Sequence, residues 1–161
     1  MVNNSTFQQC LDAAYRYLSY RPRSEVEVKQ RLHQHGFDAE VVEKTIAKLK
    51  EQSLIDDLAF ARFWKENRLS FKPKSKRLIM KELNDKMVTR EIVEQVTEDI
   101  DDMDNACKLG RRRIHIFAHL DYREFHRRLS NYLSYRGFNY EVIKHTTALL
   151  WQEKEGKPSL R

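Results

Sequence analysis

The stretch from Ser24 to Asp57 encodes two helices joined by a glycine, and its pattern recurs twice further along the chain. Ser24 and Glu27 have the spacing of a capping box, which satisfies the first amides of a helix. Gly36 follows that helix, because glycine adopts the left-handed dihedrals of a helix C-terminus at low cost. Asp38 then stands where the N-cap of a second helix is expected.

The apolar residues and caps of this stretch return at intervals of about fifty residues. Val28, Leu32, Gly36, Phe37 and Asp38 correspond to Ile79, Leu83, Met87, Val88 and Thr89, and again to Leu129, Leu133, Gly137, Phe138 and Asn139. A period of this length is typical of stacked helical units that cannot bury their apolar faces alone. The sequence therefore predicts an all-α protein of three tandem three-helix repeats that form an elongated, curved helical array.

The predicted repeats cover residues 1–55, 56–103 and 104–153, and residues 154–161 are expected to form a flexible tail. Phe37 is expected to be a buried anchor of the first repeat. In the second repeat, Phe60, Ala61, Trp64 and Phe71 are expected on one side of the first helix. In the third, one helix is expected to run through residues 106–119 (ACKLGRRRIHIFAH), and the last helix is expected to reach about Gln152.

The amino-acid composition and net charge favour a helical protein that binds a polyanion. Only four glycines and three prolines occur in 161 residues, so the turn residues of a β-rich fold are scarce. The net charge of +6 suggests a polyanionic partner. The two cysteines are too few and too far apart for a disulfide framework, which fits a reducing compartment. No signal-peptide pattern or membrane-spanning apolar run is present, so we expect a cytoplasmic monomer without membrane contact.

The residues that could carry catalysis lack the partners that catalysis needs. The glycines stand apart, so they form no phosphate-binding loop. His115 and His119 have metal-ligand spacing, but no cysteine or glutamate completes a site and the arginines before them would repel a cation. Cys10 and Cys107 have no base beside them and are expected to be small buried residues. We therefore expect no enzyme activity, no metal site and no cofactor.

Basic residues cluster in the second and third repeats, where two interpretations remain open: a solvated surface, or a stripe that binds a polyanion. Within the predicted helix 106–119, five of them recur at spacings of three and four and would share one face. The full set, which we call the basic surface, comprises Lys72, Lys74, Lys76, Arg77, Lys81, Lys108, Arg111, Arg112, His115, His119, Arg123, Arg127 and Arg128.

An acidic run, from Glu91 to Asp104, contains seven carboxylates and no base. It is either a contact surface that mimics phosphate or a set of helix-end carboxylates that complement helix dipoles. Carboxylates also begin the last helix of each repeat. Because they would face phosphate oxygens, these helices are not expected to read DNA bases as recognition helices do.

Several segments spread along nearly the whole chain carry a resemblance to a known family. They are YLSYRPRS at 17–24, LHQHGF at 32–37, LIDD at 54–57, FA at 60–61, Arg68, KEL at 81–83 and YLSYRGF at 132–138. In this order they resemble the RecX family, bacterial modulators of the RecA recombinase, whose fold is a tandem array of three-helix repeats. One feature differs from the family pattern: the sequence FKPKS at 71–75 stands where the family usually has a glycine-rich turn. One copy of the repeat also differs from the other two, since Met87 stands where they have Gly36 and Gly137.

The resemblance implies a protein that binds RecA filaments on DNA, blocks their growth, and lowers ATP hydrolysis, strand exchange and coprotease activity. The partners would be the RecA filament and, weakly, single- or double-stranded DNA. A helical protein that acts on nucleic acid alone is the other hypothesis. Weak, salt-sensitive DNA binding beside tight filament binding would favour the RecA regulator.

Overall fold

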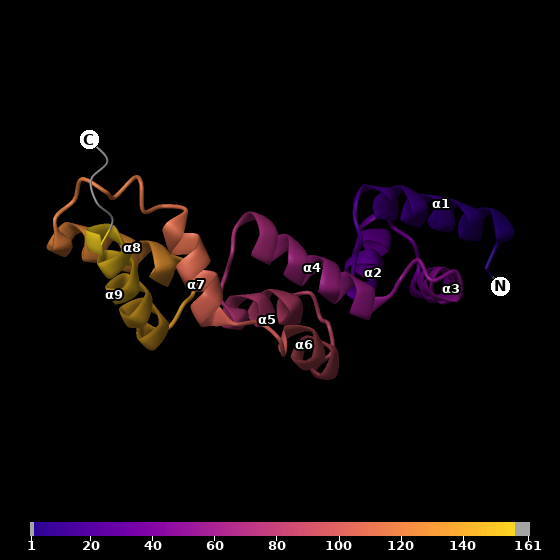
Figure 1. Ribbon diagram of the computed structural model, residues 1–161. Coiled ribbons are helices and arrows are strands. Elements are labelled where there is room, and N and C mark those ends of the chain that lie inside the picture. The colour runs from indigo at the N-terminus through magenta and orange to yellow at the C-terminus, as the bar shows by residue number, and fades with distance from the viewer. Residues whose placement is uncertain (1, 157–161) are drawn as a thin grey trace. The chain divides into compact units, whose positions relative to one another are not determined.

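The structure is a computed structural model that describes residues 2–156, and these residues form nine helices and no strand (Figure 1). The all-α prediction is therefore confirmed for the described residues. The helices are α1 (Asn4–Tyr20), α2 (Glu25–Gln34), α3 (Ala39–Glu51), α4 (Asp57–Phe71), α5 (Lys76–Asp85), α6 (Arg90–Thr97), α7 (Asp102–Arg111), α8 (Tyr122–Tyr135) and α9 (Tyr140–Gly156).

The described residues divide into two compact units, and the division passes through α4 and α5. Unit 1 contains the residues up to Lys65 together with Glu82–Val96. Unit 2 contains Glu66–Lys81 together with the residues from Thr97 onward.

The core of unit 1 lies where α3 packs on α1 and α2. Burial of apolar surface stabilises this packing, because each fully buried aliphatic side chain contributes about 1.5–3 kcal/mol. Cys10 is buried in this core, as the sequence predicted, and burial raises the pKa of its thiol despite a hydrogen bond with Thr45. The core residues are Cys10, Leu11, Ala14, Val28, Leu32, Val41, Val42, Ile46, Leu49 and Ile55.

The predicted capping box is present at the start of α2. The Glu27 N–H donates to the Ser24 hydroxyl (3.2 Å), and the Glu27 carboxylate accepts from the Ser24 N–H (3.0 Å). Beyond the C-terminal ends of α2, α5 and α8, the second residue after the helix has a positive φ: 86° at Gly36, 57° at Met87 and 88° at Gly137. Met87 therefore adopts the left-handed conformation that glycine provides in the other two copies.

Counted as three helices each, the repeats place the start of the third at Asp102 of α7, two residues before the predicted start at 104, and a repeated aspartate joins successive repeats. The Glu25 N–H in the first turn of α2 donates to the Asp57 carboxylate (2.9 Å), and the Lys76 N–H in the first turn of α5 donates to the Asp102 carboxylate (2.8 Å). Both aspartates end an Ile-Asp-Asp sequence, at 55–57 and 100–102. Burial raises the pKa of each aspartate, although the amide hydrogen bond opposes this effect.

The acidic run is explained in part by the start of α7. Asp101 is the N-cap of this helix, and its carboxylate accepts from the Asp104 N–H (3.1 Å). Asp104 in turn pairs with Lys108 (2.6 Å), and Glu94 pairs with Arg90 (2.6 Å). Asp101 and Asp104 are therefore carboxylates of a helix start, as one of the two interpretations expected, and Glu94 pairs with a cation of its own helix.

The core of unit 2 lies between α7, α8 and α9, which pack on one another. Gly110 of α7 allows the close approach, because a Cβ at this position would meet the side chain of Leu150 in α9. Cys107 is also buried, as predicted, with its Sγ 3.8 Å from the Thr146 hydroxyl. The core residues are Ala106, Leu109, Phe117, Phe125, Leu129, Leu133, Phe138, Val142 and Leu150.

Two aromatic residues do not lie where the sequence placed them. Phe37 was expected to be fully buried, but it is only partly buried, because it borders an open groove with Tyr17 and Tyr20. Phe71 was expected on the apolar side of α4, but the side chain is 77% exposed at the last residue of the helix. Phe138, by contrast, is 4% exposed and is a buried anchor.

The last helix is longer than expected. α9 continues past Gln152 to Gly156, and the Lys154 ammonium donates to the Leu120 carbonyl (3.1 Å). The first three residues of the predicted tail, 154–156, are therefore helical, and residues 157–161 lie outside the described residues.

Candidate functional site

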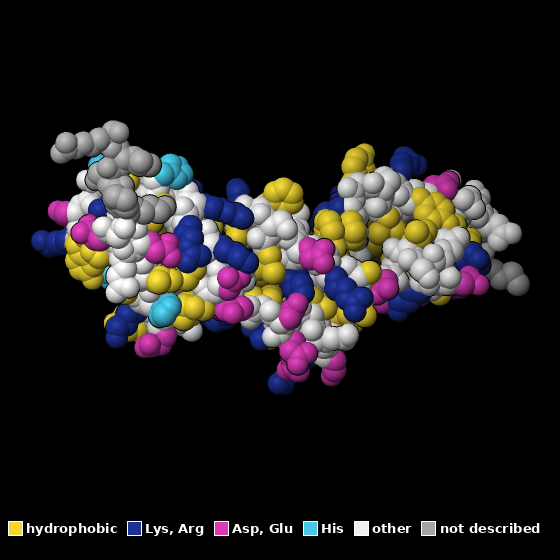
Figure 2. Space-filling view, in the orientation of Figure 1, with side chains coloured by type: hydrophobic (Ala, Val, Ile, Leu, Met, Phe, Trp, Pro, Cys, Tyr) yellow, Lys and Arg dark blue, Asp and Glu magenta, His cyan; other side chains and the backbone are white. Residues whose placement is uncertain are grey.

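The whole basic surface lies in unit 2. By sequence, unit 2 contains 18 Lys and Arg against 11 Asp and Glu, whereas unit 1 contains 12 against 13. The excess positive charge of the chain therefore belongs to one of the two units. Figure 2 shows Lys and Arg side chains, in dark blue, gathered over α7 on the face in view, with carboxylates beside them.

Five residues of the basic surface come from the segment between α4 and the end of α5. Lys72 and Lys74 lie in the turn, and Lys76, Arg77 and Lys81 lie on α5. Lys72, Arg77 and Lys81 are exposed, whereas Lys74 and Lys76 are partly buried.

Two hydrogen bonds donated by backbone N–H groups place this segment in the same unit as α7 and α8. The Ser75 N–H donates to the Arg136 carbonyl at the end of α8 (3.0 Å), and the Lys76 N–H donates to the Asp102 carboxylate at the start of α7 (2.8 Å). The structure therefore brings residues 72–81 and the α7–α9 helices into one unit, although they are distant in sequence.

The predicted helix 106–119 is wrong beyond Arg111, where α7 ends. Residues 112–120 form successive turns, in which the Ile116 N–H donates to the Arg113 carbonyl (3.0 Å) and the Leu120 N–H to the Phe117 carbonyl (3.1 Å). Such i→i−3 bonds predominate here, and only the Phe117 N–H also reaches an i−4 carbonyl, that of Arg113 (3.3 Å), among the bonds of residues 113–120. His115 and His119 consequently do not continue the helical face that carries Lys108 and Arg111.

The reason for the early end of α7 is tertiary. Phe117 is buried and meets the ring of Phe125 edge to face, with 6.3 Å between the centroids. Arg113 places its guanidinium over the ring of Tyr132, 4.7 Å from the ring centroid. The chain turns back over α8 to make these contacts.

Several residues of the basic surface are paired within the unit. Arg111 forms a two-pronged salt bridge with Glu153 of α9, at 2.8 and 3.1 Å. Arg127 and Arg128 both bind Glu124, and their hydrogen bonds lower the pKa of that carboxyl to about 2. Such pairs reduce the charge that these arginines present to a partner.

Other residues of the basic surface remain available. Lys72, Arg77, Arg112, His115, His119 and Arg123 are exposed and make no ion pair within the described part of the chain. They come from the α4–α5 turn, α5, the 112–120 turns and α8. Whether they contact a partner stays a prediction, and we regard them as the strongest candidates within the basic surface.

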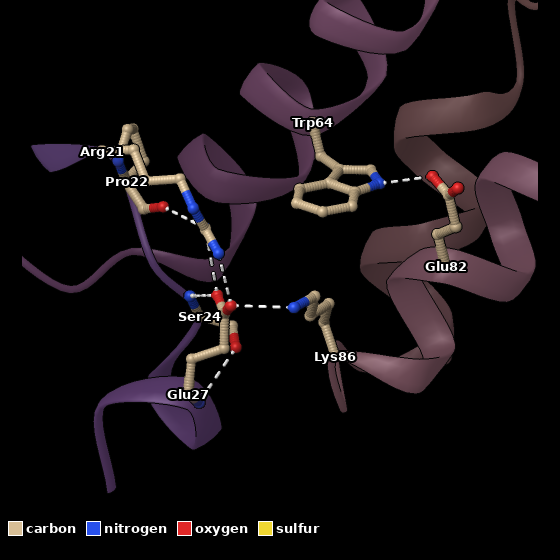
Figure 3. Close-up of polar contacts among 7 residues, drawn as sticks. All are labelled: Arg21, Pro22, Ser24, Glu27, Trp64, Glu82 and Lys86. Carbon is tan, nitrogen blue, oxygen red and sulfur yellow. Dashed lines mark hydrogen bonds and ion pairs between the residues drawn. The ribbon is translucent and has the colours of Figure 1, made fainter. Parts of the chain in front are cut away.

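Unit 1 contains a different polar cluster, which holds helices together (Figure 3). The Glu27 carboxylate accepts from Arg21 (2.7 Å), from Lys86 (2.9 Å) and from the Ser24 N–H (3.0 Å). Burial alone would raise the pKa of Glu27, but these hydrogen bonds outweigh it and lower the pKa to about 2. The cluster joins the α1–α2 turn to the end of α5.

Trp64 of α4 completes this cluster. Its indole N–H donates to Glu82 (2.8 Å), and its ring lies under the cations of Arg21 (5.7 Å) and Lys86 (5.3 Å). Both cations are therefore held between a carboxylate and an aromatic ring. The arrangement is structural, because every charge in it has a partner within the unit (Figure 3).

Among residues 2–156, no group of three or more His, Cys, Asp and Glu side chains lies where it could hold a metal ion. Neither cysteine is exposed. None of the described helices has the length and apolar character that crossing a bilayer requires.

Comparison with known proteins identifies the relatives of this chain. Models of the first, second and third three-helix domains of RecX match residues 10–49, 56–96 and 99–146. The regulatory protein RecX of Finegoldia magna is 27% identical over 154 residues, which cover 92% of this chain and 75% of the relative. The regulatory protein RecX of Prosthecochloris aestuarii is 28% identical over 145 residues, with 90% and 95% covered.

The fold agrees with solved structures. The crystal structure of RecX from Lactobacillus salivarius superposes with a TM-score of 0.75 at 22% identity and covers 95% of this chain and 99% of that one. Together the three domain models account for most of the chain, in the order that the repeats predict. The chain therefore belongs to the RecX family.

Proposed function

We propose that this protein is a non-catalytic regulator that binds RecA–DNA filaments. It inhibits filament extension and thereby lowers ATP hydrolysis, strand exchange and coprotease activity, which modulates recombination and DNA repair. Membership of the RecX family, whose relatives are named regulatory proteins, supports the regulatory role. The partners are the RecA filament and, more weakly, DNA.

The observation that carries the proposal is the uneven distribution of charge. Unit 2 has an excess of seven cations by sequence, whereas unit 1 is close to neutral. A nucleoprotein filament presents a dense array of phosphates, and arrays of Lys and Arg bind such arrays by releasing counterions. Unit 2 is therefore the part of the chain that contacts the filament.

The same charge would also suit a protein that acts on DNA alone, so the test compares the two partners directly. We expect the protein to bind a RecA–single-stranded DNA filament at least tenfold more tightly than the same DNA without RecA, measured at one salt concentration because the electrostatic term depends on salt. Equal affinity for both would support the DNA-binding function and contradict RecA regulation.

A second measurement addresses inhibition. The rate of RecA ATP hydrolysis on single-stranded DNA is followed while this protein is added at less than one molecule per RecA. We expect the rate to fall, because blocking growth at filament ends affects many RecA molecules per regulator. An unchanged rate at stoichiometric amounts would contradict the proposal.

A further inference from the structure

The turn between α4 and α5 presents an aromatic ring among cations. A groove of about 320 Å³ is lined by Asn67, Arg68, Phe71, Lys72 and Lys74, all within unit 2. Phe71 is 77% exposed. No carboxylate belongs to this lining among the residues that the structure describes.

The backbone that follows Phe71 is anchored to unit 2. Pro73 is buried, and Ser75 is fixed from both sides by its N–H bond to the Arg136 carbonyl (3.0 Å) and by the Leu78 N–H bond to its hydroxyl (3.2 Å). The turn therefore presents Phe71 and Lys72 from an anchored backbone. A single exposed apolar side chain is common on protein surfaces, so the cations beside the ring, rather than the ring alone, indicate a partner.

The chemistry of the groove favours single-stranded nucleic acid. Every base has a flat π-face that stacks on an aromatic ring, and the adjacent phosphates suit cations. In a duplex both faces of each base are already stacked, so the ring would find no open face. An acidic peptide could pair with the cations, but its carboxylate side chains have no flat aromatic face to stack on the ring.

We propose that this groove binds single-stranded DNA, with one base stacked on Phe71 and the flanking phosphates beside Lys72, Lys74 and Arg68. The inference rests on the proposed function, because the DNA is that of the RecA filament. It names Phe71 as the residue that stacks on a base of the unpaired strand. Stacking is independent of base identity, so the site has no strict sequence preference.

The test uses the full-length protein and two fluorescein-labelled oligomers of about 12 nucleotides, the length that one small binding surface covers. One is oligo-dT, and the other has the same phosphates but abasic sugars at every internal position. Fluorescence anisotropy gives the affinity for each. We expect Phe71→Ala to weaken oligo-dT binding by about 5- to 100-fold and to leave abasic binding unchanged.

Two further variants separate stacking from charge. Tyr135 is 83% exposed at the end of α8 and lies outside the groove, so Tyr135→Ala should bind both oligomers like the wild type. Lys72→Gln should weaken binding of both oligomers and reduce the slope of log affinity against log salt by about 0.7. Because Phe71 is exposed, its variant should keep the wild-type melting temperature.

Three outcomes would overturn the site. The first is Phe71→Ala binding oligo-dT as tightly as the wild type, and the second is a wild type that shows no oligo-dT binding. The third is a Phe71→Ala variant that loses affinity for the filament but not for oligo-dT, since the ring would then meet a protein surface. Wild-type inhibition of RecA ATP hydrolysis is measured in parallel, and its persistence would leave the proposed function intact in all three cases.

Discussion

Replacing Glu27 with glutamine should destabilise unit 1 in a pH-dependent way. The Glu27 carboxylate is 10% exposed and accepts hydrogen bonds from Arg21, Lys86 and the Ser24 N–H. Glutamine keeps the size of the side chain but removes the charge that these three donors share. The two cations would then remain near Trp64 without their carboxylate.

The magnitude follows from the pKa of Glu27. Burial favours the neutral form, but the hydrogen bonds prevail and lower the pKa from 4.5 to about 2. A difference of one pKa unit corresponds to about 1.4 kcal/mol, so the shift amounts to about 3.5 kcal/mol of stabilisation before solvent screening and to about 2–3 kcal/mol after it. Because the folded pKa is the lower one, this stabilisation is present above pH 4.5 and is lost as the pH falls towards 2.

The assay is urea unfolding followed by the fluorescence of Trp64, at several values between pH 7 and pH 2. Trp151 lies in unit 2, so both proteins carry Trp151→Phe and the signal reports unit 1 alone. We expect Glu27→Gln to lower the free energy of unfolding by about 2–3 kcal/mol at pH 7. The difference from the parent should shrink as the pH falls and vanish near pH 2.

Glu124 provides the control, because its pKa is also lowered to about 2 by two arginines, but at the protein surface. Because Glu124 lies in unit 2, the unfolding of Glu124→Gln is followed by the circular dichroism of the whole chain, with the wild type as its parent. Solvent screens surface pairs, so Glu124→Gln should change stability far less than Glu27→Gln at every pH. A constant difference between parent and Glu27→Gln from pH 7 to pH 2 would refute the reasoning, since the loss would then come from packing instead of charge.

The remaining predictions concern the turns and anchors of the repeats. Gly36→Ala should lower the free energy of unfolding by about 1 kcal/mol, because alanine is strained in the left-handed conformation. Gly137→Ala should lower it further, because its Cβ would also clash with the side chain of Leu78. Met87→Gly should raise stability slightly, by up to about 1 kcal/mol, since φ is already positive there; an unchanged or lower melting temperature would contradict this. Phe138→Ala should cost about 3–5 kcal/mol in urea unfolding, and Phe37→Ala clearly less, because only Phe138 is fully buried; equal losses would show that exposure does not set the cost.

Local signals in the sequence predicted the repeating part of the fold. The capping box of Ser24 and Glu27 and the turns at Gly36 and Gly137 depend on residues a few positions apart, and all are present. The Ile-Asp-Asp sequences at 55–57 and 100–102 were a further local signal. Their role was not predicted, because each second aspartate caps a helix of the preceding repeat, about 26–32 residues away.

The end of α7 and the exposure of Phe71 depend on contacts between residues in different helices, which the sequence did not reveal. Residues 112–120 contain no glycine or proline that would end a helix, yet α7 ends at Arg111 and Phe117 is buried against Phe125. The exposure of Phe71 depends on what lies opposite the end of α4, which periodicity along one helix does not reveal.

The candidate site was predictable as a set of basic residues but not as a surface. Arg111 is 42 residues from Glu153, so their salt bridge could not be anticipated. Arg77 and Arg112, by contrast, are exposed and make no ion pair within residues 2–156. Arg77 and Arg112 are therefore stronger candidates than Arg111 for contact with the filament.

The most direct test of the account measures RecA ATP hydrolysis on single-stranded DNA in the presence of a charge-reversal variant, Arg77→Glu with Arg112→Glu. The matched control is Arg16→Glu with Arg62→Glu, which changes the net charge equally but alters exposed arginines of unit 1. Each exposed contact contributes only about 0–1 kcal/mol, but reversal adds repulsion at both positions. We expect the unit 2 variant to need at least tenfold more protein for half-inhibition, while the control inhibits like the wild type. Equal inhibition by both variants would contradict the claim that the cations of unit 2 contact the filament.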